Sequence, residues 1–401
     1  MTDMLRRKII QTVGASVAFG PMLARQTAAQ ASKPDIVIAA AQPVTGVFST
    51  PGNFMNAGLG DYISWRNSRG GVLGHKLRYV WEDSSFKVDQ SVTIFKKLMA
   101  SEKPSFFYLD NTGASKAVAQ DAIASGSVMT SSPSLAGVLA DPVAMPHHFI
   151  AGPTYSAMHE ILMEYIARSS RGGSSKPSVA LVYTESEFGR DGIPVSKARA
   201  QKLGIPIVAE IVTKVTGMDV TAEVARLRRA KPDIVVFQGY VVTPIPEFVK
   251  QMREAGLSSQ IMGTIWSSDK TLVDALSALN ESYMGVVPYR YSHDTESQMM
   301  TTMREYVAKT RPEMPFISHF YVNAWLAGMV FAEVAERCIK AGKPLKLPHM
   351  KEALESMKEW DTGGLTGLLA DLSRHQIASG RLYRLDTAAK RMEPASGWIK
   401  V

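Results

Sequence analysis

The sequence has almost no cysteine and no long apolar run. Cys338 is the single cysteine among 401 residues, which excludes an internal disulfide, and its helical surroundings predict a buried, unreactive thiol. No stretch is long and apolar enough to predict a membrane-spanning helix. Low-complexity tracts are also missing. With 45% hydrophobic and 20% charged residues, the composition indicates a globular chain large enough for two lobes.

Several motifs of enzyme chemistry are missing as well. The sequence contains no Gly-x-Ser-x-Gly elbow, no phosphate-binding loop and no dinucleotide fingerprint. Ser84-x-x-Lys87 and Ser267-x-x-Lys270 match the spacing of serine–lysine acylases, but the companion elements of that class are missing. His147-His148 has no obvious third metal ligand. We therefore expect no catalytic residue, metal or cofactor, with an exported serine hydrolase or amidase on an α/β scaffold as an alternative.

The positive charge is mild and does not point to nucleic acid. The formal net charge is +8, and the basic residues are dispersed apart from Arg226-Leu-Arg-Arg229 on an apparent helix. Such a run is typical of a solvated helix face. We expect no nucleic-acid partner.

The N-terminal segment has the pattern of an export signal. Arg6-Arg7 precedes a weakly apolar run from Ile9 to Ala24, and Ala29 and Ala31 occupy the positions that a signal peptidase reads. Residues 1–31 are therefore predicted to be a signal peptide of the twin-arginine type, cleaved near Ala31. The mature protein is expected in the periplasm, and the choice between the Sec and Tat routes stays open.

One stretch changes its periodicity in the middle. Phe106 to Leu109 is an unbroken apolar run, which is typical of a strand buried on both faces, and a helical pattern follows it. The turn from Asp110 to Ser115 then lies at the carboxyl end of a strand, where open α/β sheets bind ligands. Free N–H groups there favour a small anion. The same residues are also typical of a helix cap.

Strands and helices alternate along the chain in two successive units. The first unit spans residues 35–130 and the second 157–263. Past Val287 the pattern is mainly helical, and short apolar segments at 364–369 and 382–385 predict edge strands. This order predicts two doubly wound α/β lobes with a cleft between them, in which the late helices return to the first lobe.

The collinear order of several motifs resembles a known family. The motifs are Pro43-Val-Thr-Gly46 followed by Gly58, Asn67-Ser-Arg-Gly-Gly-Val-Leu-Gly74, Tyr183 with Phe188-Gly189, Gly239-Tyr240, and Met262-Gly263. Together they resemble the type I periplasmic solute-binding proteins of ABC importers, in the branched-chain amino-acid (Leu/Ile/Val) group.

The resemblance implies two lobes joined by a three-strand hinge that closes on a ligand. It implies crossings near Pro153, Pro288 and Gly364. The first lobe would comprise residues 32–153 and 289–363, and the second 154–288 and 364–401. A monomeric receptor that delivers a small solute to an ABC permease complex in the inner membrane is expected. A ligand-sensing regulator of the same fold is an alternative, but no sensor domain or transmembrane segment follows Val401 in the sequence, so that a free-standing receptor is expected.

The resemblance also implies binding residues. First-lobe turns hold the ligand carboxylate in that family, and this role falls on Asn111, Thr112, Ala114, Ser115, Ser131 and Ser132. The matching aromatic positions are Phe48, Phe188 and Tyr240. Where amino-acid binders place a carboxylate for the ligand's ammonium, this chain reads Met262-Gly-Thr-Ile-Trp266, so Trp266 joins the aromatic wall.

This departure bears on the ligand. Burying an ammonium without a counter-charge costs several kcal/mol, whereas a flat apolar body against aromatic rings gains burial. We therefore expect an aromatic or branched apolar carboxylate. Because Asp269, Glu185 or Glu187 could reach the ligand, a branched-chain amino acid stays an open alternative.

Overall fold

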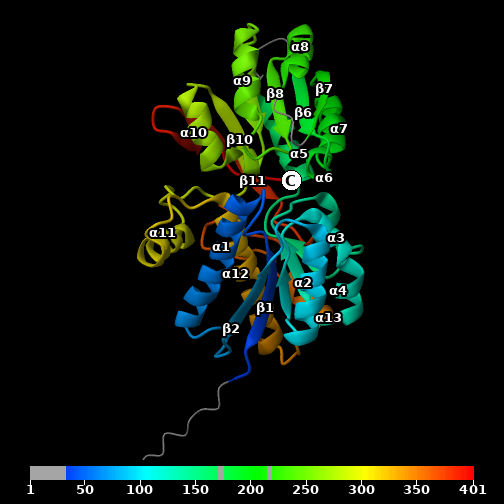
Figure 1. The fold of residues 1–401 in the computed structure, drawn as a ribbon, viewed down its shortest axis with the longest axis vertical. Helices are drawn as coiled ribbons and strands as arrows, with labels where there is room; N and C mark the ends of the chain where they lie inside the picture. Colours follow the sequence, from blue (N-terminus) through cyan, green and yellow to red (C-terminus); the bar gives the residue numbers. More distant parts are fainter. Residues whose placement is uncertain (1–32, 170–175, 215–218) are drawn as a thin grey trace, which may run out of the picture.

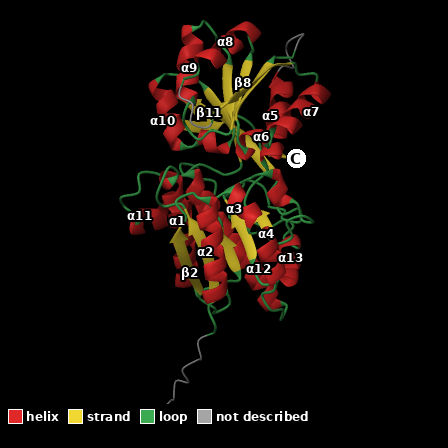
Figure 2. Cartoon of the chain, turned by 45° about the vertical axis from the view of Figure 1, so that its right-hand side comes forward, coloured by secondary structure: helices red, strands yellow, loops and turns green. Residues whose placement is uncertain are grey.

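The computed structural model describes residues 33–169, 176–214 and 219–401. Figures 1 and 2 show two lobes, one above the other, each with a sheet covered by helices. This arrangement confirms the two-lobed α/β fold class. The expected signal peptide, residues 1–31, lies outside the described residues. None of the described helices has the length and apolarity needed to cross a membrane.

The first sheet is entirely parallel, in the order β2-β1-β3-β4-β5. Its strands are β1 (Ile36–Gln42), β2 (Leu77–Asp83), β3 (Phe106–Tyr108), β4 (Met129–Ser132) and β5 (His148–Ile150). In β1, Ile38 and Ala40 belong to one apolar layer, whereas Ala39 and Ala41 belong to another. The strand is therefore buried on both faces, which explains its unbroken apolar run.

The helices of the first lobe come from two distant parts of the sequence. They are α1 (Ser49–Ser68), α2 (Val88–Ser101), α3 (Thr112–Ala117), α4 (Ala119–Ser125), the 3-10 turn η1 (Gly137–Ala140), α11 (Gln298–Thr310), α12 (His319–Lys340) and α13 (Leu347–Glu355). Phe331 of α12 packs on Phe106 and Phe149, with ring centroids 4.8 and 5.4 Å away. The helical segment past Val287 therefore covers the first sheet.

The second sheet has eight strands, parallel from β7 to β10 and antiparallel beyond. They are β6 (Val179–Thr184), β7 (Ile207–Thr213), β8 (Ile234–Gln238), β9 (Gln260–Gly263), β10 (Tyr283–Val287), β11 (Ser379–Asp386), β12 (Arg391–Pro394) and β13 (Ile399–Lys400). The accompanying helices are α5 (Tyr155–Ser169), α6 (Glu187–Arg190), α7 (Ile193–Leu203), α8 (Thr221–Ala230), α9 (Ile245–Glu254), the 3-10 turn η2 (Ile265–Ser268) and α10 (Lys270–Ala278). In this lobe α5 packs on α7, and α9 contacts both α8 and α10.

The expected edge strand at 364–369 is wrong. These residues form turns, because Gly364 and Gly367 adopt positive φ angles of 80° and 66°, a region that favours glycine and does not occur in a strand. The segment 382–385, in contrast, lies inside β11.

Residues beyond Gly364 are still bonded to the first lobe. The Leu372 N–H donates to the Met357 carbonyl at 2.8 Å, and the Ile150 N–H donates to the His375 carbonyl at 3.0 Å. The Ile377 N–H then donates to the Gly152 carbonyl at 3.0 Å. The chain enters the second sheet only at Ser379, where β11 begins.

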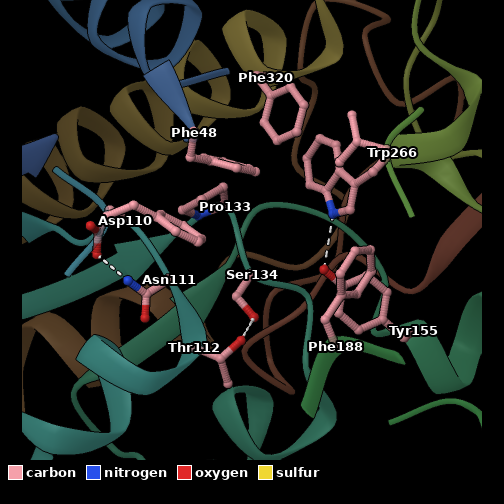
Figure 3. A pocket seen from close by; sticks show the side chains of 12 residues that line it. Phe48, Asp110, Asn111, Thr112, Pro133, Ser134, Tyr155, Phe188, Trp266 and Phe320 are labelled. Carbon is pink, nitrogen blue, oxygen red and sulfur yellow. Dashed lines mark hydrogen bonds between the residues drawn. The ribbon is translucent and has the colours of Figure 1, made fainter. Parts of the chain in front are cut away.

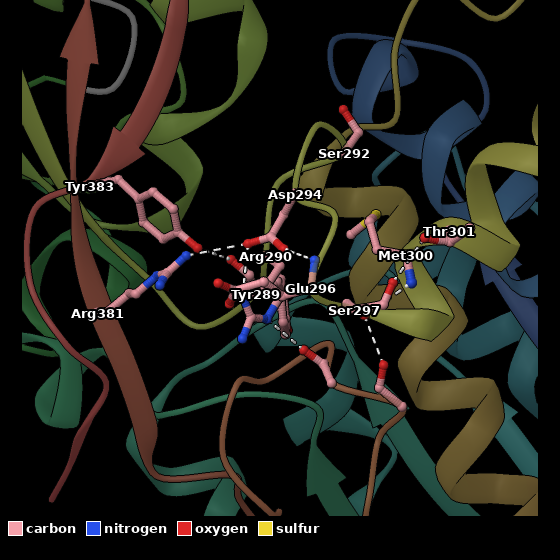
Figure 4. Close-up of polar contacts among 12 residues, drawn as sticks. Tyr289, Arg290, Ser292, Asp294, Glu296, Ser297, Met300, Thr301, Arg381 and Tyr383 are labelled. Atoms are coloured by element: carbon pink, nitrogen blue, oxygen red, sulfur yellow. Dashed lines mark hydrogen bonds and ion pairs between the residues drawn. The ribbon is translucent and has the colours of Figure 1, made fainter.

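A polar network lies in the loop that follows β10 (Figure 4). The Arg290 guanidinium donates to the Asp294 carboxylate at 2.8 Å, to Glu296, and to the Gly364 carbonyl at 2.9 Å. Arg381 of β11 donates to the same Asp294 carboxylate at 3.4 Å. The network therefore ties the loop after β10 to β11 and to the turn at Gly364.

Candidate functional site

A small cavity lies between the two lobes (Figure 3). It encloses about 100 Å³, measured to the centre of a water-sized sphere. The first lobe lines it with Phe48, Phe86, Asp110, Asn111, Thr112, Pro133, Ser134 and Phe320, and the second lobe with Tyr155, Phe188, Val241 and Trp266.

The wall residues sit where the topology of parallel sheets places ligands. Asn111 and Thr112 follow β3, Ser134 follows β4, Val241 follows β8, and Trp266 follows β9. The carboxyl ends of parallel strands meet at one edge of each sheet. The two edges face one another, so that residues far apart in sequence share one cavity.

The polar corner of the cavity consists of amide and hydroxyl groups. The Asn111 side-chain oxygen caps α3 by accepting a hydrogen bond from the Ala114 N–H at 2.9 Å, and its amide donates to Asp110 at 2.7 Å. The Thr112 and Ser134 hydroxyls are hydrogen-bonded to one another at 2.6 Å. Two rotatable hydroxyls therefore face the cavity from neighbouring strand ends.

Asp110 is the one ionisable acid on the described wall, and its carboxylate is already hydrogen-bonded. Burial raises the pKa of Asp110 to about 6, although hydrogen bonds from Ser84 and Ser91 act in the opposite direction. The side chain accepts from both serine hydroxyls and from the Asn111 amide. None of the described lining residues is Lys, Arg or His. The cavity therefore offers a ligand no cationic side chain and only a bonded carboxylate.

Aromatic rings form most of the remaining wall. Phe48 stacks on Phe86 with ring centroids 4.3 Å apart, and meets Phe320 edge-on at 5.7 Å. Tyr155 packs on Phe188 at 4.8 Å. Figure 3 shows the rings of Phe48, Phe188 and Phe320 around the space that the Thr112 and Ser134 hydroxyls face. The cavity thus has a polar corner and an apolar body.

The structure brings only some of the expected site residues to the cavity. Phe48, Asn111, Thr112, Phe188 and Trp266 line it. The expected residues that do not line it are Ala114, Ser115, Ser131, Ser132 and Tyr240.

These other residues have their polar groups bonded elsewhere. The Ser115 hydroxyl donates to the Asn111 carbonyl at 3.0 Å within the first turn of α3. Ser131 and Ser132 lie inside β4, which extends two residues beyond the expected end at Thr130, and the Ser131 hydroxyl donates to the Phe149 carbonyl at 2.9 Å. The Tyr240 hydroxyl is bonded to Thr213 at 2.6 Å.

Sequence reasoning missed several wall residues. They are Phe86, Asp110, Pro133, Ser134, Tyr155, Val241 and Phe320. Ser134 had a signal, because it belongs to the same run of small polar residues as Ser131 and Ser132. Phe86 had none, since it turns toward Phe48 through a backbone with a positive φ of 61°.

The serine–lysine motifs do not form catalytic pairs. The Ser84 hydroxyl donates to Asp110, and the Ser267 hydroxyl donates to the Thr264 carbonyl at 3.0 Å. Lys270 is paired with Asp274 instead of Ser267. Within the described ranges, no group of three or more His, Cys, Asp or Glu side chains is placed to hold a metal ion.

Comparison with known proteins identifies the family. A family model described as "Periplasmic binding protein" matches residues 35–390, so the chain belongs to this family. It is 22% identical to the Leu/Ile/Val-binding protein homolog 3 of Brucella melitensis over 249 residues. That alignment covers 62% of this chain and 65% of the relative, just under two thirds of its length.

Solved structures share the fold. A branched-chain amino-acid ABC transporter protein from Thermus thermophilus with bound valine superposes with a TM-score of 0.80 at 22% identity, covering 92% of this chain and 97% of that one. A fatty acid ABC transporter substrate-binding protein from Thermomonospora curvata gives 0.77 at 18% identity, covering 92% and 93%. At these identities the likeness concerns the fold alone.

Proposed function

We propose that the protein is the periplasmic receptor of an ABC importer and captures a small carboxylate with an aromatic or branched apolar body. One observation carries this proposal: the interlobe cavity pairs the hydroxyl corner at Thr112 and Ser134 with a wall of aromatic rings. Hydroxyl donors suit a carboxylate, and rings suit a flat or branched apolar group. The described residues that line the cavity include no nucleophile–base pair, which supports binding without catalysis.

The acidic side chains near the cavity support an acid ligand over a zwitterion. Asp269 accepts from the Ser318 hydroxyl and the His319 N–H, at 2.7 Å each. Glu185 is paired with Arg190, and Glu187 with Lys116. Together with the bonded Asp110, these carboxylates already have hydrogen-bond or ion-pair partners, so that a buried ammonium would have to share one of them.

Contacts between the lobes support capture by closure. Asp269 lies in the second lobe and Ser318 in the first, and their hydrogen bond is buried. A second contact between the lobes is the hydrogen bond that the Gly137 N–H of the first lobe donates to the Asp191 carboxylate of the second, at 3.0 and 3.1 Å from its two oxygens. We propose that both contacts form when the lobes close and break when they open.

We place the hinge in three neighbouring segments, 151–154, 288–291 and 376–378. The third replaces the crossing expected near Gly364, because residues up to His375 bond to the first lobe. The Tyr289 hydroxyl donates to the Ala151 carbonyl, and the Ile377 N–H donates to the Gly152 carbonyl. These bonds support a hinge whose strands bend together. The lobes would then comprise residues 32–153 with 289–375 and 154–288 with 379–401.

The proposed setting is the periplasm, with residues 1–31 as a cleaved export signal and an inner-membrane ABC permease as the partner of a monomeric receptor. The names of the similar proteins refer to Leu/Ile/Val, valine and fatty acids, which all have a carboxylate and an apolar body. They support the ligand class without selecting one member.

A thermal-shift panel tests the ligand class. Benzoate, 4-methyl-2-oxopentanoate and leucine are added to the purified mature chain. We expect the two acids without an amine to raise the melting temperature more than leucine does. Stabilisation by leucine alone would overturn the proposed ligand class in favour of a branched-chain amino acid. Stabilisation by none of a wider acid and amino-acid panel would overturn the receptor function.

A further inference from the structure

The hydrogen bond between Trp266 and Tyr155 has fixed donor and acceptor roles. The two atoms, the Trp266 indole nitrogen and the Tyr155 oxygen, are 2.9 Å apart, and both residues are buried. An indole N–H can only donate. The Tyr155 oxygen must therefore accept, and the phenol proton must point away from Trp266.

Among residues 33–169, 176–214 and 219–401, the bond from Trp266 is the one contact of this hydroxyl that has normal hydrogen-bond distance and angle. The phenol lies on the cavity wall, where Figure 3 shows its hydroxyl on the side of Ser134. Burial raises the pKa of Tyr155, and interactions with Trp266, with the Leu135 backbone and then with Ser134 act in the opposite direction. The Tyr155 hydroxyl thus faces the same space as the Thr112–Ser134 pair.

We propose that Tyr155 is a specificity-determining residue, whose hydroxyl donates to the ligand's carboxylate alongside Thr112 and Ser134. This inference rests on the proposed function. The bond between Thr112 and Ser134 uses one of their two protons, so one proton is left to donate. With the phenol proton, the corner offers two donors, which match the two oxygens of one carboxylate.

Trp266 is the positioning residue of this arrangement. Its indole occupies an acceptor site of the Tyr155 oxygen, which leaves the phenol oriented as a donor toward the cavity. An ammonium, which can only donate, gains less from an oxygen that is already engaged, and an alcohol accepts from the phenol only as a neutral partner, which gives a weaker bond than a carboxylate does. The pair therefore favours acceptor-only groups over donors.

Position in the fold makes Tyr155 suited to link the two lobes. It is the first residue of α5 in the second lobe, and its backbone N–H donates to the Leu135 carbonyl of the first lobe at 2.8 Å. A carboxylate held by Thr112, Ser134 and Tyr155 would contact both lobes at the hinge side of the cavity.

The test is the affinity of Tyr155→Phe for benzoate and 4-methyl-2-oxopentanoate, measured by titration calorimetry, with benzyl alcohol as the neutral probe. This change removes only the hydroxyl and keeps the ring against Phe188. We expect acid affinity to fall about 10-fold or more, as for the loss of a hydrogen bond to a charged group, while affinity for benzyl alcohol changes by less than about 3-fold.

Tyr183→Phe is the matched control. The Tyr183 phenol is also buried in the second lobe, but it donates to Glu210 at 2.7 Å and lies off the cavity. We expect it to leave acid affinity unchanged. Trp266→Phe is a second variant, expected to reduce the preference for benzoate over benzyl alcohol because the phenol loses its fixed orientation.

The outcomes separate the two proposals. Wild-type protein that binds neither acid would overturn the proposed function itself. Wild-type protein that binds an acid, with Tyr155→Phe binding it equally and melting cooperatively, would overturn the role of Tyr155 and leave the receptor function standing. An equal loss of acid affinity in Tyr183→Phe would also overturn the role of Tyr155, since the effect would then come from removing any buried phenol.

Discussion

The indole ring of Trp266 lies flat on the phenyl ring of Phe320, with centroids 4.2 Å apart and planes 9° apart. Trp266 belongs to η2 in the second lobe, and Phe320 lies near the start of α12 in the first. Both residues are buried and line the cavity. The stack therefore joins the lobes through apolar contact at the site where the ligand is proposed to bind.

Phe320→Leu tests whether this stack contributes to closure. A stacked aromatic pair adds about 0.5–1.5 kcal/mol beyond its buried area, so we expect ligand affinity to fall by roughly 2- to 13-fold. Small-angle scattering should also show a smaller ligand-induced decrease in the radius of gyration. Phe106→Leu is the control, because Phe106 packs on Phe331 within the first lobe. It should lower the melting temperature without changing the compaction. Unchanged compaction in Phe320→Leu would mean that closure does not depend on the stack.

Asp269→Asn tests the polar contact between the lobes. The Asp269 carboxylate accepts from the Ser318 hydroxyl and the His319 N–H at the start of α12, where negative charge is favourable. An amide keeps the shape but loses the charge, so we expect weaker ligand binding, by about 10-fold, through destabilisation of the closed form.

The control for Asp269→Asn is Asp233→Asn. Asp233 also accepts from a backbone N–H and a hydroxyl, both of Ser178, but within the second lobe. It should lower stability slightly and leave affinity unchanged. Equal loss of affinity in both variants would contradict a specific role for Asp269 in closure.

The fold is predictable from the sequence because most of its strands are continuous apolar runs. Ile36 to Ala41 is buried almost throughout, and the helices between strands end at recognisable turns such as Arg69-Gly70-Gly71. The strand prediction for 364–369 is wrong because the leucines of this segment lie in turns and not in a strand. Leu365 is buried, whereas Leu369 is 55% exposed.

The site is less predictable, since it depends on where each strand ends and on contacts between the lobes. Thr112 was expected because β3 ends in an abrupt change of pattern. Ser131 and Ser132 were misplaced because β4 continues through them, and polar residues in a buried strand resemble a loop in sequence. Tyr155 and Phe320 lie in the first turns of helices that reach the cavity only after the chain has crossed between lobes. No local sequence pattern indicates where the chain crosses between the lobes.

Gly58 is expected to be essential for the packing of α1 on α12. A Cβ atom at Gly58 would lie 2.3 Å from the Tyr321 carbonyl oxygen, a backbone atom that cannot move aside without shifting α12. We therefore expect Gly58→Ala to lower the free energy of unfolding by about 1–3 kcal/mol, as overpacking does. Chemical denaturation measures this change in the free energy of unfolding.

Gly60→Ala, in the same helix, provides the control for Gly58→Ala. A Cβ atom there would lie 3.6 Å from the Tyr79 ring, which is an ordinary contact. Alanine is the better helix former, so the change should raise the free energy of unfolding by up to about 1 kcal/mol. A destabilised Gly60→Ala variant would show that α1 tolerates no added methyl group, and would remove the specific role of Gly58.

The pH dependence of binding is expected to follow Asp110. Burial raises the pKa of this carboxyl to about 6, and a ligand carboxylate in the same cavity disfavours its ionised form further. The pKa of Asp110 is then higher in the complex than in the free protein. By linkage, affinity for an acid is greatest where Asp110 is protonated and falls as the pH rises through about 6. Each pKa unit of difference is worth a tenfold change in affinity.

Titrations with benzoate between pH 5 and 7.5 measure this dependence, since the ligand stays largely ionised over that range. Affinity should decrease toward pH 7.5 by up to about tenfold, and Asp110→Asn should flatten the profile because residue 110 then carries no charge at any pH. Benzyl alcohol, which has no charge to interact with Asp110, should bind equally across the range. A ligand whose ammonium contacted Asp110 would show the opposite slope, with affinity increasing as the carboxyl ionises. An increase for benzoate would contradict the placement of its carboxylate in the cavity with Asp110.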